Sequence, residues 1–209
     1  MLLRPSDAPL SDEEVRRFLE THAFGQLIAP GAGRDLPVVV PSHFAMRDAR
    51  TLLVHFARPN PVWRALEERP RALFSVVGDY VYVPSDWNAG EEAPPEWGVP
   101  TSYYAAVQLE CDVRIVDDAE EMARLLSELM RTFQPEGGHE PVRAGDNPYG
   151  RQFGAIRGAE LTVTATRAKF KFGGNRPLAH RLAVAQKLAE RDAPLDAEAR
   201  EHVLRRSSR

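Results

Sequence analysis

The segment from His55 to Trp63 contains the residue types that hold a phosphate group. It reads HFARPNPVW, so a strand is expected to end in a polar turn that leads into a short helix. Free backbone N–H groups at a helix N-terminus favour an anion, and Arg58 adds a two-pronged donor. Each charge-assisted hydrogen bond contributes roughly 1.5–3 kcal/mol, so a dianionic ligand needs several converging donors.

Two of the six histidines, His43 and His55, fall in neighbouring predicted strands. These strands are expected to form a hairpin, so the two imidazoles can reach one site. The spacing leaves two interpretations open. The histidines either share a functional site, or each is an ordinary histidine with its own hydrogen-bond partner.

The common catalytic and metal-binding motifs are absent from the sequence. There is no Walker loop, no G-x-S-x-G, no H-E-x-x-H and no Cys/His spacing of a zinc site. Gly31 and Gly33 stand between two expected strands rather than before a helix, which favours a turn over a dinucleotide-binding loop. Cys111 is the only cysteine, which excludes an internal disulfide, and its place on the apolar side of a strand favours a buried hydrophobic role. The residues indicate no metal site and no catalytic residue.

The composition is that of an ordinary soluble chain. Of the 209 residues, 43% are hydrophobic and 27% are charged, and the net charge is −3. No apolar run is long enough to span a membrane and no secretory signal is visible, so we expect a cytoplasmic protein. Residues 165–209 hold eleven Lys and Arg against five Asp and Glu. Such a basic end is either a solvated helix face or a DNA-binding surface, and the lack of a dense Lys/Arg run favours the former.

The first half of the chain predicts one helix followed by short strands. Ser11 and Glu14 form a capping box for a helix that ends before Phe24. Short connections favour antiparallel pairing of the strands that follow. The expected elements are strands over 24–29, 36–46 and 52–57, a helix over 60–66, and strands over 73–77 and 80–83 joined by a tight turn at Gly78-Asp79.

The second half predicts long strands and three further helices. Residues 84–100 hold four prolines and two glycines and form a loop, typical of a functional or mobile segment. A strand over 107–115 alternates apolar and polar residues, and a second long strand is expected over 161–172. Helices are expected after Asp118, with a buried stripe from Met122 to Phe133, and after Pro177 and Asp196. Together these elements predict a mainly β, α+β fold, an antiparallel barrel with peripheral helices.

Several motifs in a fixed order resemble the PaiB family, flavin-binding split-barrel proteins described as negative transcriptional regulators. The most specific are the H-x-A-R-x-N-P-x-W run from His55 to Trp63 and the N-R-P run at residues 175–177. The resemblance covers nearly the whole chain. The other matching pieces are Phe24-Gly25, Pro41-Ser42-His43-Phe44, Tyr82-Val83-Pro84-Ser85 with Trp87, Val99-Pro100-Thr101, Tyr104, Lys169 and Lys171.

The resemblance implies a six-stranded antiparallel split β-barrel over residues 1–172 with a C-terminal helical extension over 173–209. It also implies a homodimer that binds FMN near the subunit interface. In this fold the phosphate would be held by Ser42, His43, His55, Arg58 and Asn60. Ser85 and Thr101 would lie near the isoalloxazine, and Lys169 and Arg176 would reach the flavin or the partner subunit. The implied cofactor-binding residues are Ser42, His43, His55, Arg58, Asn60, Trp63, Ser85, Thr101, Lys169 and Arg176.

The sequence departs from the family in three places. The family usually has P-T-W-N-Y where this chain has residues 100–104, PTSYY, and a Val-His pair where this chain has Val107-Gln108. A lysine common before V-P-T is missing, and the loop carries Glu91 and Glu92. The lost tryptophan removes stacking surface, and the acidic pair has the wrong sign for a phosphate. These departures predict FMN binding that is weakened or lost, or a different ligand.

The resemblance implies an FMN-binding regulatory protein. Its candidate DNA surface is the basic C-terminal region with Arg176, Arg181, Lys187, Arg200, Arg205 and Arg206. Two alternatives follow by analogy of fold. One is an FMN-dependent oxidoreductase of the pyridoxamine-phosphate-oxidase-like fold, acting on an unknown small molecule, in which the flavin carries the electrons. The other is a haem-binding split barrel with His43 or His55 as axial ligand.

Overall fold

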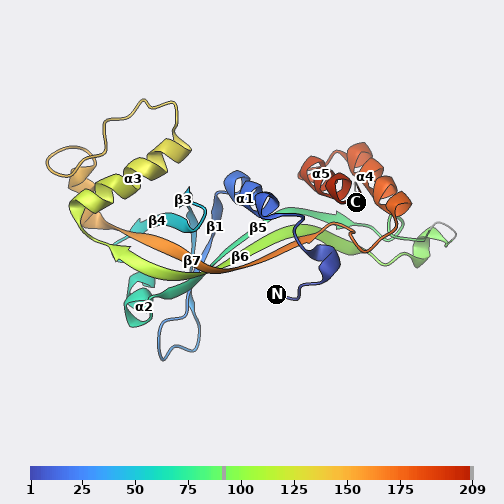
Figure 1. Ribbon diagram of the computed structural model, residues 1–209, viewed down its shortest axis with the longest axis horizontal. Coiled ribbons are helices and arrows are strands. Elements are labelled where there is room, and N and C mark those ends of the chain that lie inside the picture. Colours follow the sequence, from blue (N-terminus) through green and yellow to red (C-terminus); the bar gives the residue numbers. More distant parts are fainter. Residues whose placement is uncertain (91–92, 208–209) are drawn as a thin grey trace. The chain divides into compact units, whose positions relative to one another are not determined.

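The computed structural model describes residues 1–90 and 93–207, and the chain forms two compact units (Figure 1). The internal unit contains residues 19–76 and 108–166. The terminal unit contains residues 1–18, 77–107 and 167–209. Three long strands contribute residues to both units: β5 (Arg71–Val83), β6 (Thr101–Val116) and β7 (Ile156–Lys171). Glu91 and Glu92, the acidic pair noted in the sequence, lie outside the described residues.

Seven strands form one sheet in the order β2-β1-β5-β6-β7-β4-β3. The four shorter strands belong to the internal unit, and they are β1 (Phe24–Ala29), β2 (Val38–His43), β3 (Ala45–Asp48) and β4 (Thr51–Ala57). The pairs β1–β2, β1–β5, β3–β4 and β4–β7 are all antiparallel. The predicted antiparallel α+β fold is therefore confirmed, although the sheet of the described residues is not closed into a ring.

The sheet has seven strands rather than the six that the family resemblance implies. The segment expected as one strand over 36–46 is divided at Phe44 into β2 and β3, which pair with different neighbours. Phe44 is 1% exposed, and its backbone N–H donates to the carbonyl of Ala23, the residue before β1, at 3.1 Å. Burial of this one aromatic ring breaks the strand.

Two expected strands, 73–77 and 80–83, are a single strand. β5 continues through Gly78 and Asp79, so the predicted turn is wrong. Asp79 has a φ of 53° and is buried, with its Oδ2 atom 2.7 Å from Nε2 of His202. The turn-forming residues therefore mark an irregularity inside the strand that serves a buried polar contact.

The predicted helices are all present, with small shifts at their ends. They are α1 (Asp12–Thr21), α2 (Val62–Glu68), α3 (Ala119–Phe133), α4 (Leu178–Arg191) and α5 (Asp196–Ser207). Short 3₁₀ turns add η1 (Pro5–Asp7), η2 (Pro95–Trp97) and η3 (Gly150–Ala155). Ser11 and Asp118 each accept a hydrogen bond from the backbone N–H three residues later, at 3.2 and 2.9 Å, which confirms both predicted N-caps.

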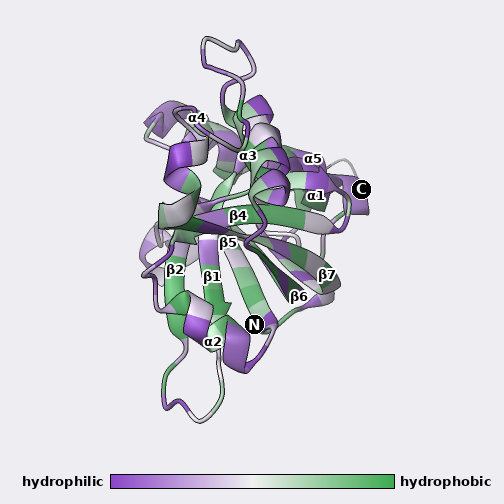
Figure 2. Cartoon of the chain, turned by 90° about the vertical axis from the view of Figure 1, so that its left-hand side faces the viewer, coloured by the Kyte–Doolittle hydropathy of each residue, from purple (hydrophilic) through white to green (hydrophobic). Residues whose placement is uncertain are grey.

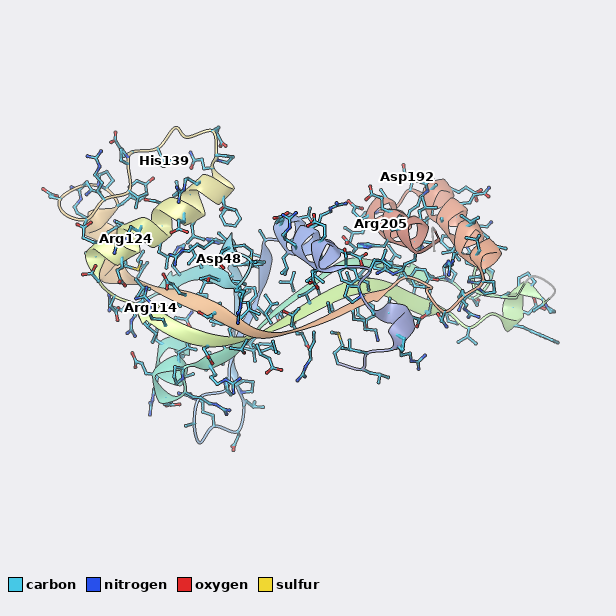
Figure 3. All side chains as sticks on the ribbon, viewed as in Figure 1. Asp48, Arg114, Arg124, His139, Asp192 and Arg205 are labelled. Atoms are coloured by element: carbon cyan, nitrogen blue, oxygen red, sulfur yellow. The ribbon has the colours of Figure 1, made fainter. Side chains whose placement is uncertain are left out.

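The core of the internal unit lies where α3 and η3 pack on β3 and β4. Met122, Leu125 and Leu129 of α3 and Leu53 of β4 are at most 3% exposed. Figure 2 shows the hydrophobic residues along β1, β2 and β4. At the sheet surface Arg114 (Figure 3) contacts Glu121 of α3 at 2.6 Å and Glu160 of β7 at 2.9 Å, which ties the helix to the strands.

The core of the terminal unit lies between the end of β7 and the helices α1 and α5. Phe170 and Phe172 are fully buried, whereas Lys169 and Lys171 alternate with them and face the other side of the strand. Phe18 of α1 meets Phe170 edge to face at 5.6 Å between ring centroids. The predicted boundary at residue 172 between a barrel domain and a C-terminal extension stays a prediction.

Two further expectations concern the character of the chain. Cys111 is fully buried on β6, and burial, followed by the charge of Asp112, raises the pKa of its thiol to about 12, so it acts as a hydrophobic residue. Among the residues that the structure describes, no helix is both long and apolar enough to cross a membrane.

Candidate functional site

The internal unit contains an apolar cavity of about 500 Å³, which we call the histidine cavity. Strands β2 and β4 contribute one imidazole each, and α3 and the η3 region supply the remaining walls. The lining residues are His43, His55, Leu126, Leu129, Met130, Phe133, Tyr149, Gln152 and Ile156. The second half of the stripe on α3, expected as core, therefore forms a cavity wall, and Phe133 is 44% exposed at its edge.

His43 and His55 lie side by side in this cavity. Their ring centroids are 5.3 Å apart with the rings inclined at 67°, and His43 also meets Phe133 edge to face at 4.9 Å. The sequence leaves open whether these histidines share a site. The structure places both of them in the lining of one cavity. The predicted hairpin itself is wrong, because β2 pairs with β1, whereas β4 pairs with β3 and β7.

The surroundings of both histidines favour the neutral imidazole. Burial lowers the pKa of His43, and burial together with the neighbouring His43 lowers the pKa of His55. Among the described residues, the buried Nδ1 atom of His55 has no hydrogen-bond partner. A neutral imidazole with one unused nitrogen can exchange a hydrogen bond with a ligand in the cavity.

Arg58, the expected phosphate donor, is bonded to the protein itself. Its Nε donates to the carbonyl of Gly154 at 2.9 Å, and its Nη2 donates to the carbonyl of Ile156 at 3.2 Å. Its Nη1 lies 3.3 Å from Oδ1 of Asp117. The guanidinium thus fastens the turn after β4 to the beginning of β7. Its contact with a phosphate stays a prediction.

The polar groups of three other predicted residues are engaged with nearby backbone. Asn60 Oδ1 accepts from the N–H of Val62 at 3.0 Å, an Asx turn that leads into α2, so the helix begins two residues later than expected. Trp63 Nε1 donates to the carbonyl of Ala57 at 2.9 Å, and Ser42 Oγ donates to the carbonyl of His43 at 2.7 Å. Their roles toward a phosphate also stay predictions.

The sequence missed Tyr149 and Gln152 as cavity residues. Tyr149 lies in the polar stretch of residues 139–150 and Gln152 follows it, and neither residue belongs to a periodic segment. A single aromatic residue in a polar loop is a weak signal for a buried contact, and Tyr149 is the one such residue between positions 139 and 150.

The terminal unit contains a second cavity, of about 280 Å³, which we call the cationic cavity. It gathers three of the predicted residues, Thr101, Lys169 and Arg176, whereas Ser85 does not line it. The lining residues are Leu2, Arg4, Ser6, Asp7, Asn88, Thr101, Tyr103, Lys169, Lys171, Gly173, Asn175 and Arg176. The ten predicted residues thus divide into six of the internal unit and four of the terminal unit.

The basic C-terminal region is not a single exposed patch. Arg181 is 9% exposed and Arg206 is 5% exposed, so the prediction that both contribute to a DNA surface is wrong. The two guanidinium groups face the protein, where Arg206 donates to Glu14 at 3.0 Å and Arg181 to the carbonyl of Arg176 at 3.0 Å. Arg205 (Figure 3) is half-buried on α5 and lies 3.8 Å from Glu201. Within the described residues no group of three or more His, Cys, Asp or Glu is placed to hold a metal ion.

Comparisons with known proteins agree with this fold. Residues 1–165 match the family described as "Putative FMN-binding domain". A curated relative is the protease synthase and sporulation protein PAI 2 of Bacillus subtilis, which is 23% identical over 185 residues, covering 87% of this chain and 86% of the relative.

Two solved structures share the fold. The flavocytochrome Anf3 of Azotobacter vinelandii matches with a TM-score of 0.59 and 17% identity, covering 79% of this chain and 69% of that chain. The FAD- and haem-binding protein of Mycobacterium smegmatis matches with a TM-score of 0.58 and 21% identity, covering 79% and 73%. These likenesses confirm the split-barrel type of fold. The chain is therefore a member of the PaiB family of FMN-binding split-barrel proteins, and the family assignment supports FMN as its cofactor.

Proposed function

We propose that the protein holds the isoalloxazine ring of FMN in the histidine cavity and that the flavin-bound protein has a regulatory role. The observation that carries this proposal is the buried Nδ1 atom of His55, which has no partner among the described residues and lies in an apolar, aromatic cavity. The pyrimidine edge of a flavin carries N–H and carbonyl groups that can exchange a hydrogen bond with an imidazole.

The size and lining of the cavity suit a flavin ring. Its volume of about 500 Å³ falls within the roughly 300–1,000 Å³ of small-molecule sites, which are mostly apolar with a few polar groups. Phe133 and Tyr149 supply aromatic surface, and the neutral histidines add polar atoms without a charge. The chemistry that bound FMN supplies is electron transfer, and the residues of the chain supply orientation and exclusion of water.

The histidine cavity offers few groups that could bind the phosphate of FMN. None of its lining residues is a lysine or arginine, and the nearby Arg58 already donates to two carbonyl oxygens. A grip by Ser42, Arg58 and Asn60 would require these side chains to exchange their present partners for the phosphate. Affinity for the ring is therefore expected to dominate, and riboflavin should bind within about tenfold of FMN.

The test is an absorption spectrum of the purified protein, repeated after incubation with excess FMN and desalting. Retained flavin bands support the proposal. The variant His55→Leu keeps the site apolar but removes the hydrogen bond, and we expect about tenfold weaker FMN binding. His22→Leu makes the same substitution outside the lining of the cavity, so it is the matched control and should leave the affinity unchanged. A colourless protein whose fluorescence titration shows no binding of FMN or riboflavin would exclude the proposal.

The paired histidines favour haem as a second candidate ligand. Two neutral imidazoles in an apolar cavity suit haem iron, and a structure of similar fold is described as an FAD- and haem-binding protein. Haemin titration distinguishes the two ligands, because a shifted Soret band that disappears in His55→Leu would indicate haem. Reduction of bound flavin by a nicotinamide cofactor, faster than reduction of free FMN, would indicate the oxidoreductase alternative.

The assembly and location are also proposed from family membership. We infer a cytoplasmic homodimer, because the family resemblance implies a dimer and a regulatory role inside the cell. Light scattering coupled to size-exclusion chromatography, with and without FMN, measures the mass directly. A monomer at micromolar concentration under both conditions would contradict the dimer.

A regulatory role draws on the name of the Bacillus subtilis relative, a protease synthase and sporulation protein. Direct DNA binding would rely on the partly exposed cations of α4 and α5, among them Lys187, Arg200 and Arg205. Charge reversal in Arg205→Glu should weaken DNA binding and flatten its salt dependence, whereas Arg64→Glu on α2 should not. If the wild-type protein fails to bind DNA even at low salt, a direct repressor role is excluded.

A further inference from the structure

The cationic cavity of the terminal unit brings together four basic side chains. Arg4 comes from the N-terminal segment, Lys169 and Lys171 from β7, and Arg176 from the turn that precedes α4. Asp7 is the single carboxylate in the lining, and its Oδ2 atom lies 3.5 Å from Nζ of Lys169. The cavity therefore carries a clear excess of positive charge.

The fold holds the two lysines in place from both sides. Phe170 and Phe172 are buried on the opposite face of β7, so the alternation of the strand turns both lysines toward the cavity. Lys169 is 8% exposed and its Nζ donates to the carbonyl of Leu2 at 3.0 Å. Lys171 Nζ donates to Thr101 Oγ1 at 2.7 Å.

The charges inside the cavity are not balanced by the protein. Burial lowers the pKa of the Lys171 ammonium, and the nearby cations Lys169 and Arg4 lower it further, while Asp7 acts in the opposite direction. An anion bound here would relieve that repulsion. Because a protein site that concentrates like charges is costly unless it meets an opposite charge, the arrangement favours an anionic ligand.

Asn88 adds an acceptor to this cationic lining. Its side chain is 7% exposed, and its Nδ2 donates to the carbonyl of Val99, which fixes the orientation of the amide. Among the described residues its buried Oδ1 accepts no hydrogen bond. Buried acceptors are usually satisfied, so this oxygen indicates a donor on the ligand, a hydroxyl or an N–H group.

We propose that the cationic cavity binds a phosphate monoester that also carries a hydroxyl or N–H donor. Lys171, Thr101 and Arg176 would bind the phosphate, and Asn88 would accept from the neighbouring donor. The volume of about 280 Å³ suits a small phosphorylated compound or the phosphorylated end of a larger one. This proposal does not depend on the histidine cavity. Its ligand is either FMN, through its phosphate and ribityl hydroxyls, or a separate phosphorylated metabolite.

Calorimetric titration with glycerol 3-phosphate, at constant low ionic strength in chloride, tests the proposal. We expect saturable binding that weakens at least about tenfold in Lys171→Met, because a charge-assisted hydrogen bond is lost. The exposed Lys187→Met on α4 removes the same charge outside the cavity and should bind like the wild type. Arg176→Met provides a second variant, in case Lys171→Met unfolds.

Propyl phosphate tests the role of Asn88, because it has the same charge but no hydroxyl. It should bind about three- to tenfold more weakly than glycerol 3-phosphate. Equal binding of the two esters would show that no hydrogen bond from the ligand to Asn88 contributes to the affinity. Absence of saturable binding by glycerol 3-phosphate, or equal binding by the wild type, Lys171→Met and Arg176→Met, would overturn the proposal.

Competition separates the two sources of the ligand and the two cavities. Displacement of glycerol 3-phosphate by FMN but not by riboflavin identifies the flavin phosphate as the occupant. Displacement by neither, with binding otherwise as expected, identifies a separate metabolite. Riboflavin has no phosphate, so its fluorescence is expected to report the histidine cavity alone. If the cationic cavity binds no phosphate ester, riboflavin can still bind to the histidine cavity. If riboflavin does not bind, the cationic cavity can still bind glycerol 3-phosphate.

Discussion

The two cavities differ in charge although one strand contributes to both. The first residue of β7, Ile156, lines the apolar histidine cavity, and its last residue, Lys171, lines the cationic cavity. In the histidine cavity burial lowers the pKa of both imidazoles and so favours their neutral form, whereas in the cationic cavity four basic groups face one carboxylate. The first can select a ligand by shape and the exclusion of charge, and the second by charge. One flavin nucleotide has both kinds of surface, so each cavity needs its own test.

A buried ion pair lies behind the strand that carries the lysines of the cationic cavity. Arg206 is 5% exposed, contacts Glu14 at 3.0 Å, and lies over the rings of Phe170 and Phe172 at 5.4 and 5.6 Å. We expect Arg206→Met to reduce the free energy of unfolding by about 3–5 kcal/mol, since it leaves a buried carboxylate without its guanidinium. Urea denaturation measures the loss.

The control for this ion pair is a double variant. Glu14→Gln with Arg206→Met leaves neither charge buried, so it should be more stable than Arg206→Met alone. Binding of riboflavin to the histidine cavity should persist in folded Arg206→Met, whereas binding of glycerol 3-phosphate should fall. A stability loss below about 1 kcal/mol in Arg206→Met would show that the pair contributes little.

Acid should act on the two cavity histidines and on Glu14 in different pH ranges. Burial lowers the pKa of His43 and His55 below their ordinary value of 6.5, so their contribution to stability is full above about pH 6.5 and is lost as pH falls below it. Burial would raise the pKa of Glu14, but hydrogen bonds from His202, Arg206 and the N–H of Leu10 outweigh it and lower the pKa from 4.5 to about 2. Its contribution, on the order of 3 kcal/mol, is full above about pH 4.5 and is lost between pH 4.5 and 2.

Free energies of unfolding measured across these ranges test the assignment. His43→Leu with His55→Leu should flatten the pH dependence just below pH 6.5 and leave the lower range unchanged. Glu14→Gln should flatten only the range below pH 4.5. If the two variants change the same range, the attribution of one range to the histidines and the other to Glu14 is wrong.

Gly173 fixes the turn at the end of the cationic cavity. Its φ is 73°, and a Cβ atom there would lie 2.4 Å from the hydroxyl of Tyr103, which is 2% exposed. We expect Gly173→Ala to cost about 2–3 kcal/mol, from backbone strain and from the clash together. Gly137→Ala is the matched control, because its φ is 74° with open space around it, and it should cost only about 1 kcal/mol.

Removing the tyrosine hydroxyl should restore part of the loss in Gly173→Ala. The double variant with Tyr103→Phe takes away the atom nearest to the new methyl group, so its stability should approach that of Gly137→Ala. If the double variant is no more stable than Gly173→Ala, the whole loss of stability comes from the backbone conformation.

Much of the fold could be predicted from the sequence because most strands and helices carry a local signal. The capping residues Ser11 and Asp118 and the alternation along β6 are read directly from the chain, and the structure confirms them. The division at Phe44 and the continuous β5 through Asp79 could not be predicted, because both result from the burial of one side chain against distant segments.

The candidate sites were predictable only in part. His43 and His55 do lie close together, but not through the predicted hairpin, since their strands do not pair with each other. The shared orientation of Lys169 and Lys171 follows from the two-residue period of a strand. The partners of Arg58 could not be predicted, since Gly154 and Ile156 lie almost a hundred residues away and offer only backbone carbonyls. A sequence pattern identifies side chains that can donate charge-assisted hydrogen bonds, but it does not identify the acceptors that they already contact.

The smallest expected effect concerns Arg58, and it decides whether the histidine cavity also holds a phosphate. Arg58→Met removes hydrogen bonds to Gly154 and Ile156 on a partly exposed side chain, so it should cost only about 1 kcal/mol of stability. If the guanidinium serves the backbone alone, the affinities for FMN and riboflavin should change equally. If it turns to the phosphate of FMN, only FMN should weaken, by about tenfold or more. Arg64→Met on α2, whose side chain is 83% exposed, is the control for a lost charge nearby. A selective loss of FMN would make the histidine cavity a complete nucleotide site and would favour a separate metabolite as the ligand of the cationic cavity.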